Sequence, residues 1–569
     1  MGFFNPGCFK QTIVLAALFC AALCGLSWLL LWIYNGVEDQ YPTGFMAGWI
    51  CFFGMLWSLV LFRHARENID DRGPIGMLFT GIFGCYFVVC AVLFLCIFIA
   101  LVSLDAGGTS IWALLTFIVI VALIVIWCQK ESARASEGDF FDEDDGPCST
   151  FVVQIVLAVL CFIALFFHIT MAAQALGAAR DQASITPPGK IVQAADIDGV
   201  FSDMHIYCLD NDDDDYDVSG LPLVLLESAL NAPGSVAWAN VQQPLARVVR
   251  VCSYDRRGYG WSWRGPNPRH VSRFADELNE LLSLAQERRS IVMVGWGYGG
   301  MAAMSYAHQY PAQVKGAVFV DALHPEAATV ESSADSQTVS VSVEDEFSVD
   351  AGVSSYDNFV RFFAPLGFIR MGESSSVETG SLGFPLDTLR LLPDRAFEAY
   401  RAFLLGYYHP NVVVQEKREW TRLSYDDVLR ADNSEVLRNC PAAKSGVKDC
   451  TNCCNLYDVL DTPVSELPIG VVSAAGGSDN YVDLQKKIAA LSNDSIHVTS
   501  KEEAFLPMTD PDLLVSTIIQ VTARAAVVAG VRLDALAGRR RALSTPIDQE
   551  TEIELLTDHL MRRWNHVKK

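Results

Sequence analysis

Cysteine is the residue type whose spacing in this chain most directly suggests a crosslink or a bound metal. Cys440, Cys450, Cys453 and Cys454 lie close together, and thiolates at such spacing can hold zinc. The same residues can form disulfides in an oxidising compartment. No histidine lies near them, and the topology derived below places them outside the cytosol. We therefore expect disulfides here, with a zinc site as the alternative.

The acidic run Asp210–Asp217 is a second place where an ion could bind. A Ca²⁺ loop needs a glycine at its sharp turn and a distal glutamate, and this run has neither. We therefore interpret it as a solvated loop and expect no metal and no cofactor. The net charge of −24 also argues against a nucleic-acid partner, because phosphate binding needs clustered lysine and arginine.

Five stretches in the first third of the chain are long and apolar enough to cross a bilayer, which takes about 20 residues. None has an Asp, Glu, Lys or Arg in its interior, so the signature of a pump or proton relay is missing. We predict five transmembrane helices whose partner is the lipid bilayer. The predicted spans are Thr12–Tyr34, Phe45–Phe62, Gly76–Val102, Ser110–Cys128 and Ser149–Ala173.

Basic residues fall on alternate loops between these spans, which predicts their orientation. They lie before the first span, after the second and before the fifth, at Lys10, Arg63, Arg66, Arg72, Lys130 and Arg134. This predicts a cytoplasmic N-terminus, and five crossings then place the rest of the chain outside the cell or in a lumen. The membrane is the plasma membrane or an endomembrane. Asn493, in Asn493-Asp494-Ser495, is a candidate glycan acceptor there.

The remaining sequence alternates short β-branched runs with amphipathic segments, which is typical of a mostly parallel sheet covered by helices. Phe274, Leu278, Leu281 and Ala285 share one face of such a helix. The predicted strands are Met204–Leu209, Leu223–Glu227, Val248–Tyr254, Ile291–Val294, Ala317–Val320, Ile469–Ser473 and Ile496–Ser500.

Several stretches of this half resemble the α/β-hydrolase family, in particular its esterase- and peptidase-like branch. They include LPLVLLESALNAP, RVVRVCSYDRRGYGWS, IVMVGWGYGGMAAMSYAHQYPAQVKGAVFVDALHPE and LPIGVVSAAGGSD, and the resemblance covers roughly residues 195–525. It implies a mostly parallel sheet with helices on both faces and a lid insertion.

The predicted organisation therefore has four parts. Residues 1–175 form the transmembrane domain and 176–194 a linker, and residues 195–530 form the hydrolase-like domain, with a lid at about 324–467. Residues 531–569 form an amphipathic helical tail with Ile553, Leu556, Leu560 and Trp564 on one face. Two interpretations of the tail stay open: it packs on its own domain, or it docks on a partner or the membrane surface.

In the family that the chain resembles, a strained turn of pattern G-x-S-x-G presents the serine nucleophile. Here the turn reads Gly295-Trp296-Gly297-Tyr298-Gly299, so both flanking glycines are present but the nucleophile position is Gly297. The family's histidine base lies seven residues before the proline that opens the final helix, which is Ala504 here. Asp479 is the candidate for a remaining acid, and Asp321 is a second.

The loop that would bind the oxyanion also departs from the family pattern. It reads Glu227-Ser228-Ala229-Leu230-Asn231, with Ala229 and Asn231 where small flexible residues usually let backbone N–H groups face the developing charge. The oxyanion-loop equivalents are Ala229 and Tyr298. Candidate pocket residues under the lid are Trp296, Tyr298 and Leu230.

A triad without serine and histidine loses on the order of a million-fold in kcat. We therefore expect a membrane-anchored pseudoenzyme that serves in binding, scaffolding or assembly, with other membrane-protein subunits or an apolar ligand as partners. One alternative is an active hydrolase whose nucleophile is displaced to Ser228, Tyr298 or a lid serine. Another is a structural subunit of a larger membrane complex.

Overall fold

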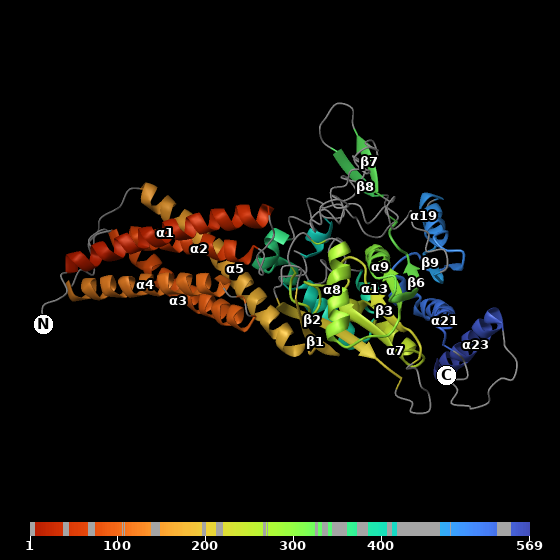
Figure 1. Cartoon of the computed structure of the whole chain (residues 1–569). Coiled ribbons are helices and arrows are strands. Elements are labelled where there is room, and N and C mark those ends of the chain that lie inside the picture. Colours follow the sequence, from red (N-terminus) through yellow and green to blue (C-terminus); the bar gives the residue numbers. More distant parts are fainter. Residues whose placement is uncertain are drawn as a thin grey trace, which may run out of the picture. The chain divides into compact units, whose positions relative to one another are not determined.

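The chain divides into two compact units in the computed structural model (Figure 1). Unit 1 comprises Met1–Thr186, Phe359–Glu373 and Leu405–Tyr407, and unit 2 comprises the remaining residues. The structure describes residues 6–37, 45–66, 74–104, 106, 108–137, 148–195, 201–211, 220–265, 269, 271–324, 328–332, 339–343, 361–371, 385–406, 412–417, 467–477, 479–531 and 548–568.

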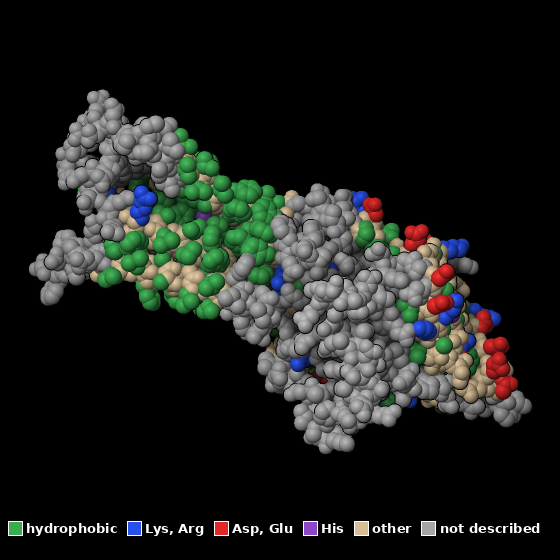
Figure 2. Space-filling view, turned by 90° about the horizontal axis from the view of Figure 1, so that it is seen from above, with side chains coloured by type: hydrophobic (Ala, Val, Ile, Leu, Met, Phe, Trp, Pro, Cys, Tyr) green, Lys and Arg blue, Asp and Glu red, His purple; other side chains and the backbone are tan. Residues whose placement is uncertain are grey.

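Unit 1 is built on five long apolar helices, which confirms the predicted membrane domain. They are α1 (Pro6–Val37), α2 (Met46–Arg66), α3 (Pro74–Ser103), α4 (Gly108–Glu137) and α5 (Cys148–Ser184). Each contains a stretch of 18 to 27 residues long and apolar enough to cross a membrane. Side chains such as Phe94, Ile50 and Ile120 are buried between the helices, while the outer faces keep exposed Leu, Ile, Val and Phe (Figure 2). A surface of this composition suits lipid rather than water.

The residues predicted as a linker, 176–194, include the end of one helix and most of one strand. Helix α5 continues to Ser184, and strand β1 (Lys190–Ala195) begins six residues later. The helix continues past Ala173, where the predicted span ends, because Ala175, Leu176, Ala178 and Ala179 are good helix formers. Ala175 and Ala178 are also buried in unit 1.

Unit 2 contains an eight-stranded sheet in the order β1-β2-β4-β3-β5-β6-β9-β10. The strands after β1 are β2 (Phe201–Leu209), β3 (Leu223–Glu227), β4 (Val251–Asp255), β5 (Ile291–Trp296), β6 (Val314–Val320), β9 (Ile469–Ser473) and β10 (Ser495–Thr499). The pairs β1–β2 and β2–β4 are antiparallel and the other neighbours are parallel. All seven predicted strands are present. β1 was not predicted; apart from Ala195 it lies inside the segment predicted as a linker.

Helices cover both faces of the sheet, as predicted. α8 (Val271–Leu284), α9 (Tyr298–Gln309) and α19 (Asp479–Ala489) share one core with Leu225, Met293, Phe319 and Val471. On the other face, α21 (Pro511–Val528) packs against Gly316 and Gly470, where an added Cβ would lie 3.0–3.2 Å from side chains of α21. That face also carries α7 (Ala239–Ala246), which contacts α21 and β4.

Helix α21 is a sixth helix whose length and composition would allow it to cross a membrane. It contacts β5, β6 and β9 of the sheet, and ten of its residues, Leu514 and Ile518 among them, are buried. Its apolar character is therefore explained by the core of unit 2. The C-terminal helix α23 (Gln549–Lys568) contacts α21 and α7, with Leu556 and Leu560 fully buried. Of the two interpretations of the tail, the structure supports packing on its own domain.

The described parts of the predicted lid belong to both units. Unit 2 holds a two-stranded sheet, β7 (Ala328–Ser332) and β8 (Val339–Val343), together with α13 (Leu386–Leu389), α14 (Asp394–Leu404) and the helical residues 412–417. Unit 1 holds η2 (Ala364–Leu366) and α11 (Phe368–Met371).

Candidate functional site

The turn between β5 and α9 has the geometry needed to present a nucleophile, but its apex carries no side chain. Gly297 lies at the apex with φ 54° and ψ −121°. Its N–H donates to Val320 O at 3.0 Å, and its carbonyl accepts from the N–H of Leu323 at 3.0 Å. This backbone would be strained for any other residue type, as it is in a G-x-S-x-G nucleophile turn, but glycine adopts it readily. A glycine at the apex has no atom that can attack a carbonyl.

The flanking glycines explain how this turn fits. A Cβ on Gly295 would lie 2.5 Å from Gly299 O, and a Cβ on Gly299 would lie 2.5 Å from Ser228 O. Both positions lack room for any side chain. A Cβ on Gly297 would instead lie 3.1 Å from the Cβ of Ala229. The methyl group of Ala229 thus borders the space into which a nucleophile would project.

The loop after β3 keeps a glycine-like backbone at Asn231, where φ is 65°. The carbonyl of Asn231 accepts from the Tyr400 hydroxyl at 3.2 Å, which ties this loop to α14. The Oγ atom of Ser228 and the Oδ1 atom of Asn231 are buried and have no hydrogen-bond partner among the described residues. Ser228, one of the displaced nucleophiles considered above, therefore has no base within hydrogen-bonding distance in the part of the chain that the structure describes.

Arg256 anchors the same loop from the end of β4. Its Nη1 atom donates to the Glu227 carboxylate at 2.6 Å and to Ser228 O at 2.5 Å, and its Nη2 atom donates to Ala229 O at 3.1 Å. Burial raises the pKa of Glu227, although the charge of Arg256 opposes that effect. The loop carbonyls are thus occupied by a buried guanidinium.

A lid residue completes the environment of Arg256. The Glu416 carboxylate accepts from Arg256 Nε and Nη2 at 3.2 and 2.9 Å, and from the Tyr259 hydroxyl at 2.9 Å. All three residues are buried. A two-point guanidinium–carboxylate pair is among the stronger polar contacts in proteins. Residues 412–417 are therefore fixed against the loop after β3.

The predicted pocket residues lie in packed surroundings. Tyr298 is fully buried, its ring 6.1 Å from that of Phe274, and it shares an apolar cluster with Leu230. Trp296 packs edge-on against Trp238, with ring centroids 6.3 Å apart. The surroundings of Tyr298 are those of a core side chain, which favours packing over a nucleophilic role.

Two aspartates were considered for the acid, and their positions differ. Asp479 is the exposed first residue of α19. Asp321 directly follows β6 in the segment that is hydrogen-bonded to Gly297, and its Oδ1 accepts from the Tyr481 hydroxyl at 2.6 Å. Burial raises the pKa of Asp321 to about 6, and the Tyr481 hydrogen bond opposes part of that rise. Of the two aspartates, Asp321 is the one whose backbone segment is hydrogen-bonded to the turn at Gly297.

The position of the base lies in the loop after β10. Ala504 is half-buried there, and its carbonyl accepts from the Thr509 hydroxyl at 2.9 Å. The loop from Ser500 to Asp510 contains no histidine. The nearest histidine in the sequence, His497, is exposed in the middle of the edge strand β10, and its Nε2 lies 2.6 Å from Ser473 Oγ.

A buried group of histidine, aspartate and serine exists elsewhere in unit 2, but its order is not that of a catalytic relay. His205 Nδ1 lies 2.9 Å from Asp255 Oδ2, and the Ser235 hydroxyl donates to Asp255 Oδ1 at 3.0 Å. The aspartate therefore stands between the serine and the histidine, whereas a triad needs the histidine between the other two. This group holds β2, β4 and α6 (Gly234–Ala237) together.

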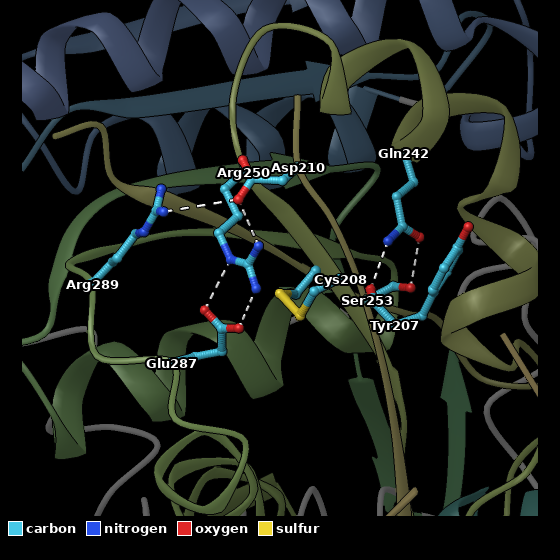
Figure 3. The surroundings of a disulfide bond; sticks show 9 residues. Tyr207, Cys208, Asp210, Gln242, Arg250, Ser253, Glu287 and Arg289 are labelled. Atoms are coloured by element: carbon cyan, nitrogen blue, oxygen red, sulfur yellow. Dashed lines mark hydrogen bonds and ion pairs between the residues drawn. A yellow bond between two sulfur atoms is a disulfide. The ribbon is translucent and has the colours of Figure 1, made fainter. Parts of the chain in front are cut away.

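Sequence reasoning missed the disulfide that the structure contains, between Cys208 and Cys252 of the antiparallel strands β2 and β4 (Figure 3). The Glu287 carboxylate lies near both sulfurs. It pairs with Arg250, which also donates to Asp210 Oδ2 at 2.8 Å. Because the sulfurs are bonded to each other, this group is a crosslink rather than a metal site. Opposed positions on two predicted neighbouring strands were the signal that could have revealed it.

Cys440, Cys450, Cys453 and Cys454 lie outside the described residues, so the predicted lid disulfides stay a prediction. Asn493 is exposed in the turn between α19 and β10, and its glycosylation also stays a prediction.

Comparison with known proteins gives one family match, to the family described as "alpha/beta hydrolase fold", over residues 222–438. A stretch of 83 residues is 39% identical to the uncharacterized protein C23C11.06c of Schizosaccharomyces pombe, and covers 15% of this chain and 16% of that one. A stretch of 106 residues is 31% identical to the probable transporter efuK of Hormonema carpetanum, and covers 18% and 15%. The matches thus span about a sixth of the length of these relatives.

Solved structures of hydrolases also match. They include an epoxide hydrolase, CorEH (TM-score 0.38, 15% identity, 59% of this chain and 98% of that one). Another is a putative ancestral haloalkane dehalogenase, AncHLD2 (TM-score 0.41, 14% identity, 59% and 99%).

Proposed function

Because this chain carries an α/β-hydrolase domain together with a membrane domain of five helices, we propose that it is a membrane-anchored pseudoenzyme of that family. Its hydrolase-like domain serves as a binding, scaffolding or assembly module. Its partners are other membrane-protein subunits or an apolar ligand held under the lid.

One observation carries this proposal: the turn between β5 and α9 keeps the positive φ of a nucleophile turn, while its apex is Gly297. Acyl transfer needs a nucleophile, a base and donors aimed at the oxyanion. The apex lacks the first, and Ala504 occupies the position of the second. At the third, Ala229 and Asn231 replace the small flexible residues that usually let backbone N–H groups face the developing charge.

The proposal includes an extracellular or lumenal position for the hydrolase-like domain. The alternation of basic loops supports it. The Cys208–Cys252 disulfide supports it independently, because disulfides persist mainly in oxidising compartments.

An active hydrolase with a displaced nucleophile is the second candidate. Ser228 is buried without a partner among the described residues, and Tyr298 is fully buried in an apolar cluster. Both observations favour the pseudoenzyme. The displaced nucleophile of this candidate could also be a lid serine outside the described residues, which a labelling experiment would identify.

The test is active-site labelling of the purified full chain in detergent with a fluorophosphonate probe, next to an active serine hydrolase of the same fold. We expect no labelled serine and no hydrolysis of short acyl esters above background. Labelling at any serine would overturn the pseudoenzyme and identify the displaced nucleophile.

Native mass spectrometry of the same preparation separates the two binding roles. A co-purifying protein supports an assembly subunit, whereas a single chain with bound lipid supports a ligand-binding module. If the chain carries neither a bound protein nor a bound lipid, both in membranes and in mild detergent, both roles are contradicted.

A further inference from the structure

Part of the predicted lid packs among the membrane helices. Residues Phe359–Glu373 belong to unit 1, and Arg361–Met371 are described there as two short helical turns joined at Gly367. Gly367 has φ 81°, and a Cβ on it would collide with the carbonyl of Thr170 on α5. The backbone of this segment therefore lies directly against α5.

Residues 361–371 contact α5 far inside the apolar part of that helix. The ring of Phe368 lies 6.3 Å from that of Phe166 and 5.9 Å from that of Phe167. After Phe166, the first charged residue on α5 is Arg180. These 14 positions (180 − 166) correspond to roughly 21 Å of helix. Since Phe166 and Leu176 are both exposed on the outside of the bundle, Phe368 lies beside a lipid-facing part of the helix.

Irregular backbone at such depth is tolerated only where protein buries it, and the break between the two short helical turns meets that condition. Ala364 is 5% exposed and Leu366 is fully buried. The carbonyl of Phe362 accepts from the Trp49 indole N–H at 2.9 Å. Trp49 also packs against the rings of Phe362 and Phe363, at 5.0 and 6.0 Å. The polar backbone is thus covered by α2 and α5.

Charged side chains of the segment are also accommodated. Arg370 pairs with Asp181 at 2.8 Å and donates to Gln174 Oε1 at 3.1 Å. It thus reaches along α5 toward the first charged residues of that helix, as long basic side chains do near a membrane surface. Phe368 and Met371 remain exposed by 36% and 58%. An apolar, outward-facing pair therefore lies between the lipid-facing Phe166 and this charged level.

We propose that residues 361–371 form a re-entrant segment through which the lid enters one leaflet of the bilayer. Phe368 and Met371 contact the acyl chains of that leaflet, and Arg370 lies at the level of the headgroups. The hydrolase-like domain is therefore held to the membrane at a second place in addition to its covalent link through α5. Acyl chains are the proposed occupants because the exposed pair continues the lipid-facing surface of α5.

The test uses the full chain reconstituted in phosphatidylcholine vesicles with a photoactivated diazirine that partitions into the hydrocarbon. Labelled positions are mapped by peptide mass spectrometry. We expect Phe368 and Met371 to be labelled to within about threefold of Phe166. Leu391, which is 50% exposed in unit 2, and Leu555, which is 41% exposed there, serve as unlabelled controls. Labelling of α5 without labelling of residues 361–371 would overturn the proposal.

A charge variant gives a second readout. Met371→Lys should reduce labelling of residues 361–371 to the level of Leu391, while labelling of Phe166 stays unchanged; Leu391→Lys is the matched control. A protein occupant would instead protect Met371 from the diazirine and allow zero-length crosslinks between copies or to another chain. That pattern would also overturn the proposal. Fluorophosphonate labelling of a serine would reject the pseudoenzyme while leaving this segment in the bilayer.

Discussion

At the scale of single residues, the proposed loss of catalysis has a geometric side as well as a chemical one. A serine at position 297 would need a left-handed backbone, and its Cβ would lie 3.1 Å from the Cβ of Ala229. That separation is tighter than an ordinary carbon–carbon contact. The nucleophile position and the oxyanion loop are therefore coupled, and a single substitution restores neither.

A stepwise restoration series tests this coupling. Gly297→Ser alone should stay at background in fluorophosphonate labelling, because no base accepts its proton and loss of the base costs about a million-fold. Adding Ala504→His and then Ala229→Gly should give weak, increasing labelling. Asp321→Asn and Asp479→Asn in the triple variant identify the acid. Strong labelling of the single variant would show that a base exists elsewhere.

His205 predicts a pH dependence of stability. Its two ring nitrogens face Asp255 and the carbonyl of Pro188. Burial lowers the pKa of His205, but the charge and hydrogen bonds of Asp255 and Pro188 outweigh this and raise it above 6.5. The folded state thus binds the proton more tightly. The resulting stabilisation is complete below the ordinary pKa and is lost as pH rises through the folded-state pKa.

The measurement is the difference in melting temperature between the natural chain and His205→Gln across pH 5 to 9. We expect the difference to be largest at the acidic end and to narrow as pH rises. The control is Lys486→Gln, which changes an exposed residue far from His205 in the sequence. Its difference in melting temperature from the natural chain should not narrow as pH rises. A constant difference for His205→Gln would contradict a charged histidine at this position.

At the scale of elements, helix α23 offers a closely matched pair of neighbouring leucines. Leu556 is fully buried against unit 2, and Leu555 is 41% exposed. Leu556→Ala should lower the free energy of unfolding by about 2–5 kcal/mol, because it leaves a cavity. Leu555→Ala should change it by about 0.5 kcal/mol. Calorimetry of the full chain in detergent measures both, and equal effects would mean that α23 does not pack as described.

The helices and strands are the part of the structure that the sequence predicted best. β3 and β9 begin and end where their apolar runs predict, because parallel strands buried on both faces read as continuous β-branched runs. The five spans were found for a similar reason, since a bilayer requires long apolar stretches. Contacts between distant segments determine the pairing of Cys208 with Cys252 and the position of residues 361–371. They also determine the limited space between Ala229 and position 297. Local sequence patterns carry little information about these.

At the scale of the whole molecule, the orientation across the membrane predicts a modification. If unit 2 is extracellular or lumenal, Asn493 is open to glycosylation, because it is exposed in a turn. The chain made in a eukaryotic secretory host should shift in gel mobility after glycosidase treatment, and Asn493→Gln should abolish the shift. Protection of unit 2 from protease added outside intact cells, together with no glycan on Asn493, would place it on the cytoplasmic side.

The crosslink between β2 and β4 has a consequence for synthesis of the chain. Strands β1, β2, β3 and β4 all lie between Lys190 and Asp255 and are neighbours in the sheet. If unit 2 is extracellular or lumenal, as proposed, Cys208 and Cys252 can join once residue 252 has crossed the membrane, while α9, β9 and α21 are still being translated. The covalent bond would close a loop of 44 residues, which removes on the order of 4 kcal/mol of chain entropy from the unfolded state. An emerging chain would then hold half of its sheet as a template on which β5, β6, β9 and β10 are added in order.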